Sequence, residues 1–239
     1  MRHVNPTEDD PTAAFLRRLH QLSAEMAQRT IGQSRTPDGL LALAEGMAEL
    51  ADVATARLTV VLPPERHSAC GRGCAHCCKH GGVMVDPVSV LALTLTLTGQ
   101  YDPVDLAGIM LRLSASAAGA CALVDAHDSC LAYVARPLTC RVVNSYDDET
   151  CRQFGPPTVA QVAGGEGVAL GYPVPLAIAA AIVAGVAQGL ATCGILCAPV
   201  ELNAALRVAL SEPDVLERWL AGEDVFAGLV PLAPDVPSA

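Results

Sequence analysis

The sequence predicts a mainly α-helical fold whose helices surround an irregular, cysteine-rich segment, with one short β-hairpin. Hydrophobic residues make up 51% of the 239 residues and charged residues only 17%, so the chain can bury a sizeable core. Helix-start signals recur along the chain, and eight of the ten cysteines fall in two stretches without helical patterning. We expect a single domain over residues 1–239, with the cysteine-rich segment at 63–157 and a frayed tail at 231–239.

Most of the expected helices begin with one signal, a capping side chain followed directly by proline. Asp and Thr side chains cap helix N-termini, and proline suits the first turn. Apolar residues recur at helical spacing after each signal. These starts are Asp10-Pro11, Thr36-Pro37, Asp86-Pro87 and Asp102-Pro103. After Asp86, the β-branched run Leu93–Thr98 is also compatible with a strand.

The stretch from Gly167 to Val200 contains no charged residue and is long enough to cross a bilayer. Alanine and glycine dominate it, and its flanks lack the basic clusters and aromatic belts of membrane-spanning helices. We therefore interpret Leu176–Cys193 as a buried central helix. Two amphipathic helices, Glu201–Leu210 and Pro213–Leu220, are expected to close the domain.

Composition excludes several classes of function. A net charge of −10 and an aromatic content of 3% argue against a nucleic-acid partner. The chain has too few basic side chains to neutralise phosphates and too few aromatic side chains to stack on bases. The sequence contains no glycine-rich phosphate loop and no serine nucleophile elbow. The N-terminal MRHVNPTEDDPT has neither the basic region nor the apolar region of a secretory signal, so we expect a cytoplasmic protein without a membrane partner.

Four cysteines lie within nine residues, in the run Cys70-Gly-Arg-Gly-Cys74-Ala-His-Cys77-Cys78. In a reducing compartment, clustered cysteines more often bind metal than form disulfides. Thiolates favour zinc, copper(I) and iron–sulfur clusters. Three histidines share this loop, and each is either a ligand, a support for a ligand or a solvated side chain: His67, His76 and His80.

A second set of cysteines follows, at Cys121, Cys130 and Cys151 and within Arg136-Pro137-Leu-Thr-Cys140-Arg141. The combined pattern, C-x3-C-x2-CC and then C-x8-C-x5-RP-x2-CR, resembles a bacterial cysteine-cluster family described as a zinc- or iron-chelating domain. It is also similar to the cysteine-rich part of the flagellin lysine N-methylases. The resemblance implies a metal or iron–sulfur centre with eight thiolate ligands: Cys70, Cys74, Cys77, Cys78, Cys121, Cys130, Cys140 and Cys151.

Eight thiolates could form two tetrahedral zinc sites or hold iron–sulfur clusters. The adjacent Cys77 and Cys78 favour a polynuclear centre, because neighbouring side chains diverge. We therefore expect a metal-binding protein, with an iron–sulfur cluster preferred over zinc. The resemblance to the methylases implies an alternative, an iron–sulfur-dependent enzyme that modifies a protein or peptide. A third hypothesis is a zinc-organised module that binds a protein or peptide partner.

Three further expectations concern residues around the cysteines. Bound metal is expected to supply the order of the long stretch from Gly119 to Pro157. The guanidinium groups of Arg136 and Arg141 are expected to donate hydrogen bonds to backbone carbonyls of the metal loops or to an acidic ligand. His127, between Asp125 and Asp128, is expected to belong to a polar turn.

The last two cysteines, Cys193 and Cys197, lie in an apolar run. If the central helix continues through Gly194, their spacing of four places them on one helix face. We expect them to be packing residues rather than ligands, since free cysteine behaves as a small buried hydrophobe.

Overall fold

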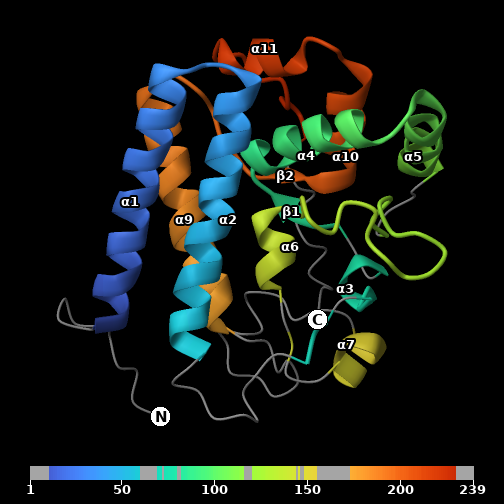
Figure 1. Cartoon of the computed structure of the whole chain (residues 1–239), viewed down its shortest axis with the longest axis horizontal. Coiled ribbons are helices and arrows are strands. Elements are labelled where there is room, and N and C mark those ends of the chain that lie inside the picture. Colours follow the sequence, from blue (N-terminus) through green and yellow to red (C-terminus); the bar gives the residue numbers. More distant parts are fainter. Residues whose placement is uncertain are drawn as a thin grey trace, which may run out of the picture.

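The protein is mainly α-helical, as the sequence predicts (Figure 1). The computed structural model describes residues 11–59, 69–71, 73–79, 82–115, 120–143, 145, 148–154 and 173–229. The helices within these ranges are α1 (Pro11–Gln33), α2 (Pro37–Thr59), α3 (His76–Lys79), α4 (Pro87–Gln100), α5 (Pro103–Ala115), α6 (Leu138–Val142), α7 (Asp148–Phe154), α9 (Pro173–Thr192), α10 (Leu202–Ser211) and α11 (Val215–Leu220). The tail at 231–239 lies outside the described residues.

Three long helices, α1, α2 and α9, run side by side and form one half of the molecule (Figure 1). The apolar helix α9 turns Ile178, Ile182 and Val186 into the core, and each is fully buried. Its glycines bring the backbone of α1 into contact, because a Cβ atom at Gly185 or Gly189 would collide with a carbonyl oxygen of α1. Small residues in an uncharged run therefore serve close helix packing.

One window of α9, Pro175–Thr192, is long and apolar enough to cross a membrane when judged by length and composition. Within the protein, 44% of that window is buried. The buried side packs against α1 and α2, which agrees with the expected central helix.

The other half of the molecule is built on α4 and α10, which pack together beneath α11 and beside α5 (Figure 1). A two-stranded antiparallel sheet precedes both helices: β1 (Met84–Val85) pairs with β2 (Val200–Glu201). Asp86 caps α4, since its Oδ1 accepts the Ser89 amide at 2.8 Å. The sheet and this cap place the start of α4 beside the cysteine-rich segment.

The run Leu93–Thr98 is helical and belongs to α4. Its threonine hydroxyls donate to carbonyl oxygens one turn earlier, from Thr94 to Val90 at 2.9 Å and from Thr96 to Ala92 at 2.9 Å. These bonds satisfy the hydroxyl groups within an apolar helix. Tertiary burial of α4 thus overrides the β-propensity of this run.

Several expected boundaries differ from the structure. The final helix begins at Val215 rather than Pro213, because Pro213 and Asp214 form a turn. The central helix ends at Thr192, since Gly194 adopts a left-handed φ of 75°. The condition under which Cys193 and Cys197 would share a helix face is therefore not met.

Candidate metal centre

The second cysteine loop, residues 120–136, is a compact turn that joins α5 to α6. Its hairpin is smaller than the sequence suggests, with a single bridge between Val124 and Cys130 and an amide bond from Leu131 to the Leu123 carbonyl at 2.9 Å. At the tip, the Asp125 carboxylate accepts the amides of His127 and Ser129 at 2.8 and 2.9 Å, and these bonds lower the pKa of Asp125. The expected polar turn is confirmed.

Side chains from the surrounding helices hold this loop in place. Arg112 of α5 donates to the Ala122 carbonyl at 2.9 Å. Asn203 of α10 accepts the Ala122 amide at 3.1 Å and donates to the Ala120 carbonyl at 2.8 Å. The hydroxyl of Tyr101, which follows α4, donates to the Leu131 carbonyl at 3.0 Å. Side chains of the helical framework thus hold residues 120–131 of the stretch whose order was expected to come from bound metal.

The Arg-Pro-x-x-Cys-Arg element closes the loop and starts α6. Arg141 donates to the carbonyl oxygens of Val134 and, at 3.2 Å, of Arg136. Arg136 donates to the Tyr133 carbonyl at 3.0 Å, and its guanidinium lies 3.8 Å from the centre of the Tyr133 ring. Both arginines therefore bond backbone carbonyls of the metal loops, one of the two roles expected for them.

The first cysteine segment is attached to the second within the described residues. The Cys121 amide donates to the Cys78 carbonyl at 2.7 Å, and Lys79 pairs with Asp128 at 2.7 Å. The sulfur of Cys70 accepts a hydrogen bond from the amide of Ser145 at 3.3 Å. Ser145 is almost fully buried. Short helix α3 carries Cys77 and Cys78 toward the loop, below α6 (Figure 1).

Cys77 lies within electrostatic range of several other thiols. Its sulfur is 3.9 Å from that of Cys78, and contact with that thiol together with burial raises the pKa of Cys77. A thiolate at Cys77 would raise the pKa of four other cysteines from the first segment, the second loop and α6: Cys74, Cys121, Cys130 and Cys140. Segments separated by more than forty residues therefore bring their thiols into one region.

Burial keeps several of these thiols protonated in the metal-free protein. It raises the pKa of Cys121 to about 11 and that of Cys140 to about 12. Burial also raises the pKa of Cys130, whereas the positive charge of Arg136 acts in the opposite direction on Cys130 and Cys140. Arg136 is thus placed to offset negative charge when these thiols ionise.

The other expected ligands lie near this group with fewer described contacts. Cys151 is buried on α7, which packs against α3. His76 begins α3 and is partly buried. His67 and His80 lie outside the described residues.

The remaining two cysteines lie on other elements. Cys197 is buried beside Asp86 at the start of α4, and burial raises the pKa of its thiol. Cys193 follows α9, and its carbonyl accepts a bond from Arg35 at 2.5 Å. No two of the ten cysteines, all of which lie within the described residues, form a disulfide.

The donor set fits a soft metal, because sulfur ligands predominate and Arg136 can offset their charge. Within the described part of the chain, however, no three His, Cys, Asp or Glu side chains converge closely enough to hold a metal ion. A bound metal would therefore require the thiols to lie closer together than they do in this arrangement. Such coupling of metal binding to local folding is common in small thiolate sites.

The residues that support the site could not be predicted from the cysteine motifs. Arg112, Asn203, Tyr101 and Ser145 contact the cysteine segments, but none stands in a cysteine motif. Each acts through contacts between distant parts of the chain, so local spacing carries no signal for them.

Comparison with known proteins agrees with this geometry. Residues 69–156 match the family model CxxCxxCC, described as "Putative zinc- or iron-chelating domain". The match covers just over a third of the chain and includes all eight cysteines of the two sets. No curated protein and no solved structure matches the chain.

Proposed function

We propose that this chain, whose residues 69–156 carry a zinc- or iron-chelating domain, binds a metal centre through its clustered thiolates and that the centre is an iron–sulfur cluster. The observation that carries the proposal is the position of Cys77. Thiols from the first segment, the second loop and α6 lie within its electrostatic reach. A group of sulfur donors without a disulfide is a suitable environment for a thiolate-bound metal.

The number of thiols favours a cluster over a single zinc ion. A structural zinc site takes four ligands, whereas Cys77 and the thiols that respond to its charge already number more than four. The adjacent Cys77 and Cys78 also suit a polynuclear centre better than two separate knuckles. The proposed ligands are the eight cysteines of the two sets: Cys70, Cys74, Cys77, Cys78, Cys121, Cys130, Cys140 and Cys151.

The chain's own residues would orient and balance this centre. Arg141 holds the loop carbonyls that precede Cys140, and Arg136 places positive charge near Cys130 and Cys140. A bound cluster would supply one-electron redox chemistry or a rigid cross-link between the two segments. Because free thiols must persist until metal binds, we place the protein in a reducing compartment, the cytoplasm.

The test is anaerobic purification with measurement of iron, sulfide and zinc per chain and of the visible spectrum. Wild-type protein is expected to contain iron and sulfide and to absorb visible light. Cys77→Ser and Cys140→Ser should each lose most of the metal, because each removes a ligand from the centre. Cys197→Ser is the matched control, since this buried cysteine lies beside Asp86 and should be dispensable for metal.

Three outcomes would contradict the proposal in different ways. Colourless protein with stoichiometric zinc would support the thiolate metal site but show that its metal is zinc and not an iron–sulfur cluster. Metal-free protein that is fully folded, with ten reactive thiols, would remove the metal site altogether. Retention of all metal by both Cys77→Ser and Cys140→Ser would refute the ligand assignment.

A further inference from the structure

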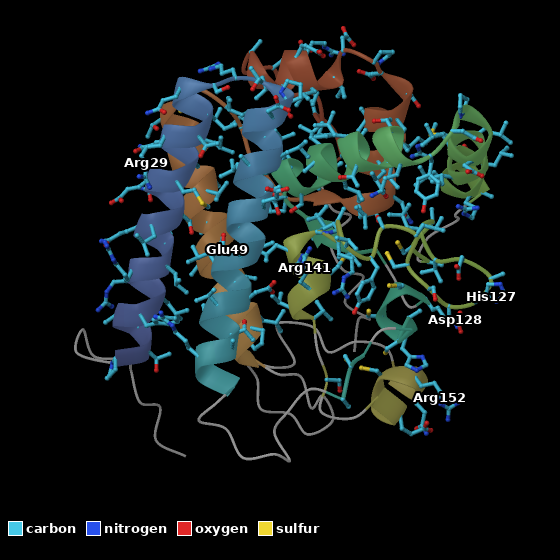
Figure 2. The ribbon with its side chains drawn as sticks, viewed as in Figure 1. Arg29, Glu49, His127, Asp128, Arg141 and Arg152 are labelled. Carbon is cyan, nitrogen blue, oxygen red and sulfur yellow. The ribbon has the colours of Figure 1, made fainter. Side chains whose placement is uncertain are left out.

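The first cysteine segment and the second loop meet at an ion pair between two side chains at the surface. The ammonium group of Lys79, at the end of α3, lies 2.7 Å from the carboxylate of Asp128 at the tip of the loop (Figure 2). Each partner lies within two residues of a proposed thiolate ligand, Cys78 or Cys130. The ion pair therefore joins the backbone pieces that carry thiols of both segments.

Contacts inside the turn hold the backbone of Asp128. Its two neighbours, His127 and Ser129, donate their amides to the Asp125 carboxylate at 2.8 and 2.9 Å. The Asp128 amide donates to the Asp125 carbonyl at 3.2 Å. Asp128 has a left-handed φ of 58°, which Asp and Asn adopt more readily than most residues. The turn thus presents the carboxylate through contacts that do not involve α3.

Helix α3, in contrast, depends on contacts with other elements. It has four residues, which are too few for a helix to be stable by itself. At its C-terminal end, the Cys78 carbonyl accepts the Cys121 amide at 2.7 Å. The next residue, Lys79, forms the ion pair with the loop. One backbone hydrogen bond and one ion pair therefore dock the same end of α3 on the second loop.

We propose that the Lys79–Asp128 ion pair is a clasp that positions Cys77 and Cys78 against the second loop and slows the release of bound metal. The effect on metal rests on the proposed function, whereas the positioning of α3 applies to the protein with or without metal. The two side chains are 46% and 52% exposed, so the pair contributes little to global stability. Its effect is local, because opening the clasp frees one short helix and leaves the core intact.

Two adjacent amides report the docking of α3 and the stability of the loop separately. The Cys121 amide donates to α3, whereas the Ala122 amide donates to the Asn203 side chain on α10 at 3.1 Å. The experiment measures exchange of both amides by NMR in the full, reduced, metal-free chain. Asp128→Asn should speed exchange at Cys121 about two- to fivefold and leave exchange at Ala122 unchanged. Asn also tolerates a left-handed φ, so this variant removes the charge without straining the turn.

A double-mutant cycle separates the ion pair from other effects of each charge. Lys79→Gln should speed exchange at Cys121 by a factor similar to that of Asp128→Asn, and the double variant should exchange no faster than either single variant. Glu25→Gln, which removes an exposed carboxylate from α1, is the control and should leave both amides unchanged. Unchanged exchange at Cys121 in Asp128→Asn, equal acceleration at Ala122, or additive effects in the double variant would overturn the clasp.

Transfer of metal from the anaerobically purified protein to a chelator tests the effect on metal. Asp128→Asn should contain as much metal as wild type and release it about two- to fivefold faster at low salt. High salt should abolish this difference, because it screens exposed charges. Equal release rates at low salt would refute the role in metal retention, and a loss of bound metal would show that Asp128 is a ligand and not part of a clasp. Metal-free wild type would contradict the proposed function alone, since exchange at Cys121 still tests the clasp.

Discussion

The two cysteine segments of this protein are supported differently. The second loop, residues 120–136, receives hydrogen bonds from Arg112, Asn203 and Tyr101, which belong to or adjoin three different helices. The described contacts of the first segment go to this loop, through Cys78 and Lys79, and to Ser145 and α7, which follow the loop in sequence. The second loop is thus attached to the helical framework, whereas the first segment is attached to the framework mainly through the second loop and the residues that follow it.

A protein with such unequal support can combine an anchored loop with a segment whose order depends on metal. The anchored loop carries Cys121 and Cys130, α6 carries Cys140, and framework side chains bond the loop backbone beside Cys121. The first segment supplies the remaining thiols on short backbone pieces that pack against that arrangement. We infer that metal mainly orders the first segment, because it has fewer anchors of its own among the described residues.

Removal of the metal is the strongest test of this contrast. After anaerobic treatment with a chelator, amide exchange in residues 69–79 should increase about tenfold or more, because their order depends on the thiolate bonds. Exchange in residues 120–143 should change much less, since the framework still holds that loop. Hydrogen-exchange mass spectrometry measures both segments in one sample. An equal increase in exchange in both segments would show that metal orders them to the same extent.

Alkaline pH should destabilise the metal-free, reduced protein through its anchored thiols. Burial raises the pKa of Cys121 to about 11 and that of Cys140 to about 12, from 9.0. A thiol whose folded-state pKa is raised stabilises the protein fully below the unfolded pKa and loses that contribution as pH rises toward the folded pKa. The free energy of unfolding should therefore fall between about pH 9 and 11.

Denaturant titrations across this range provide the measurement. The double variant Cys121→Ser with Cys140→Ser serves as the comparison, and its loss of stability with pH should be shallower. If both proteins show the same pH dependence, ionisation of these two buried thiols does not limit stability.

A smaller effect is expected from the arginine that closes the second loop. Arg141→Ala removes the donor to the Val134 and Arg136 carbonyls and should lower the free energy of unfolding by about 1–3 kcal/mol. Arg207→Ala, at an exposed position on α10, is the control and should leave stability nearly unchanged. Equal stability of the two variants in chemical denaturation would show that the loop does not need this anchor.

Much of the helical framework could be predicted from local chemistry. The Asp86-Pro87 signal begins α4, and the Asp102-Pro103 signal begins α5, because capping and a fixed proline φ act within one turn. The fate of Leu93–Thr98 was open between helix and strand. Burial against α2 and α10 decided for the helix, and no local pattern reports such burial.

The candidate site was predicted less completely than the framework. Cysteine spacing identified the thiols, and the structure gathers many of them around Cys77. The spacing of four between Cys193 and Cys197 does not reflect a shared helix face, because α9 ends at Thr192 and Gly194 adopts a left-handed φ. The anchors Arg112 and Asn203 could not be predicted, since their partners in the loop depend on how α5 and α10 pack.

By itself, the sequence determined the helix starts, the apolar core and the presence of two thiol-rich segments, because each depends on neighbouring residues or on composition. Only the tertiary structure decided that the second loop is attached to the framework, that Cys77 lies among thiols from distant segments, and that Lys79 pairs with Asp128 across the two segments. These features require side chains far apart in the chain to meet, and that meeting depends on the packing of whole helices.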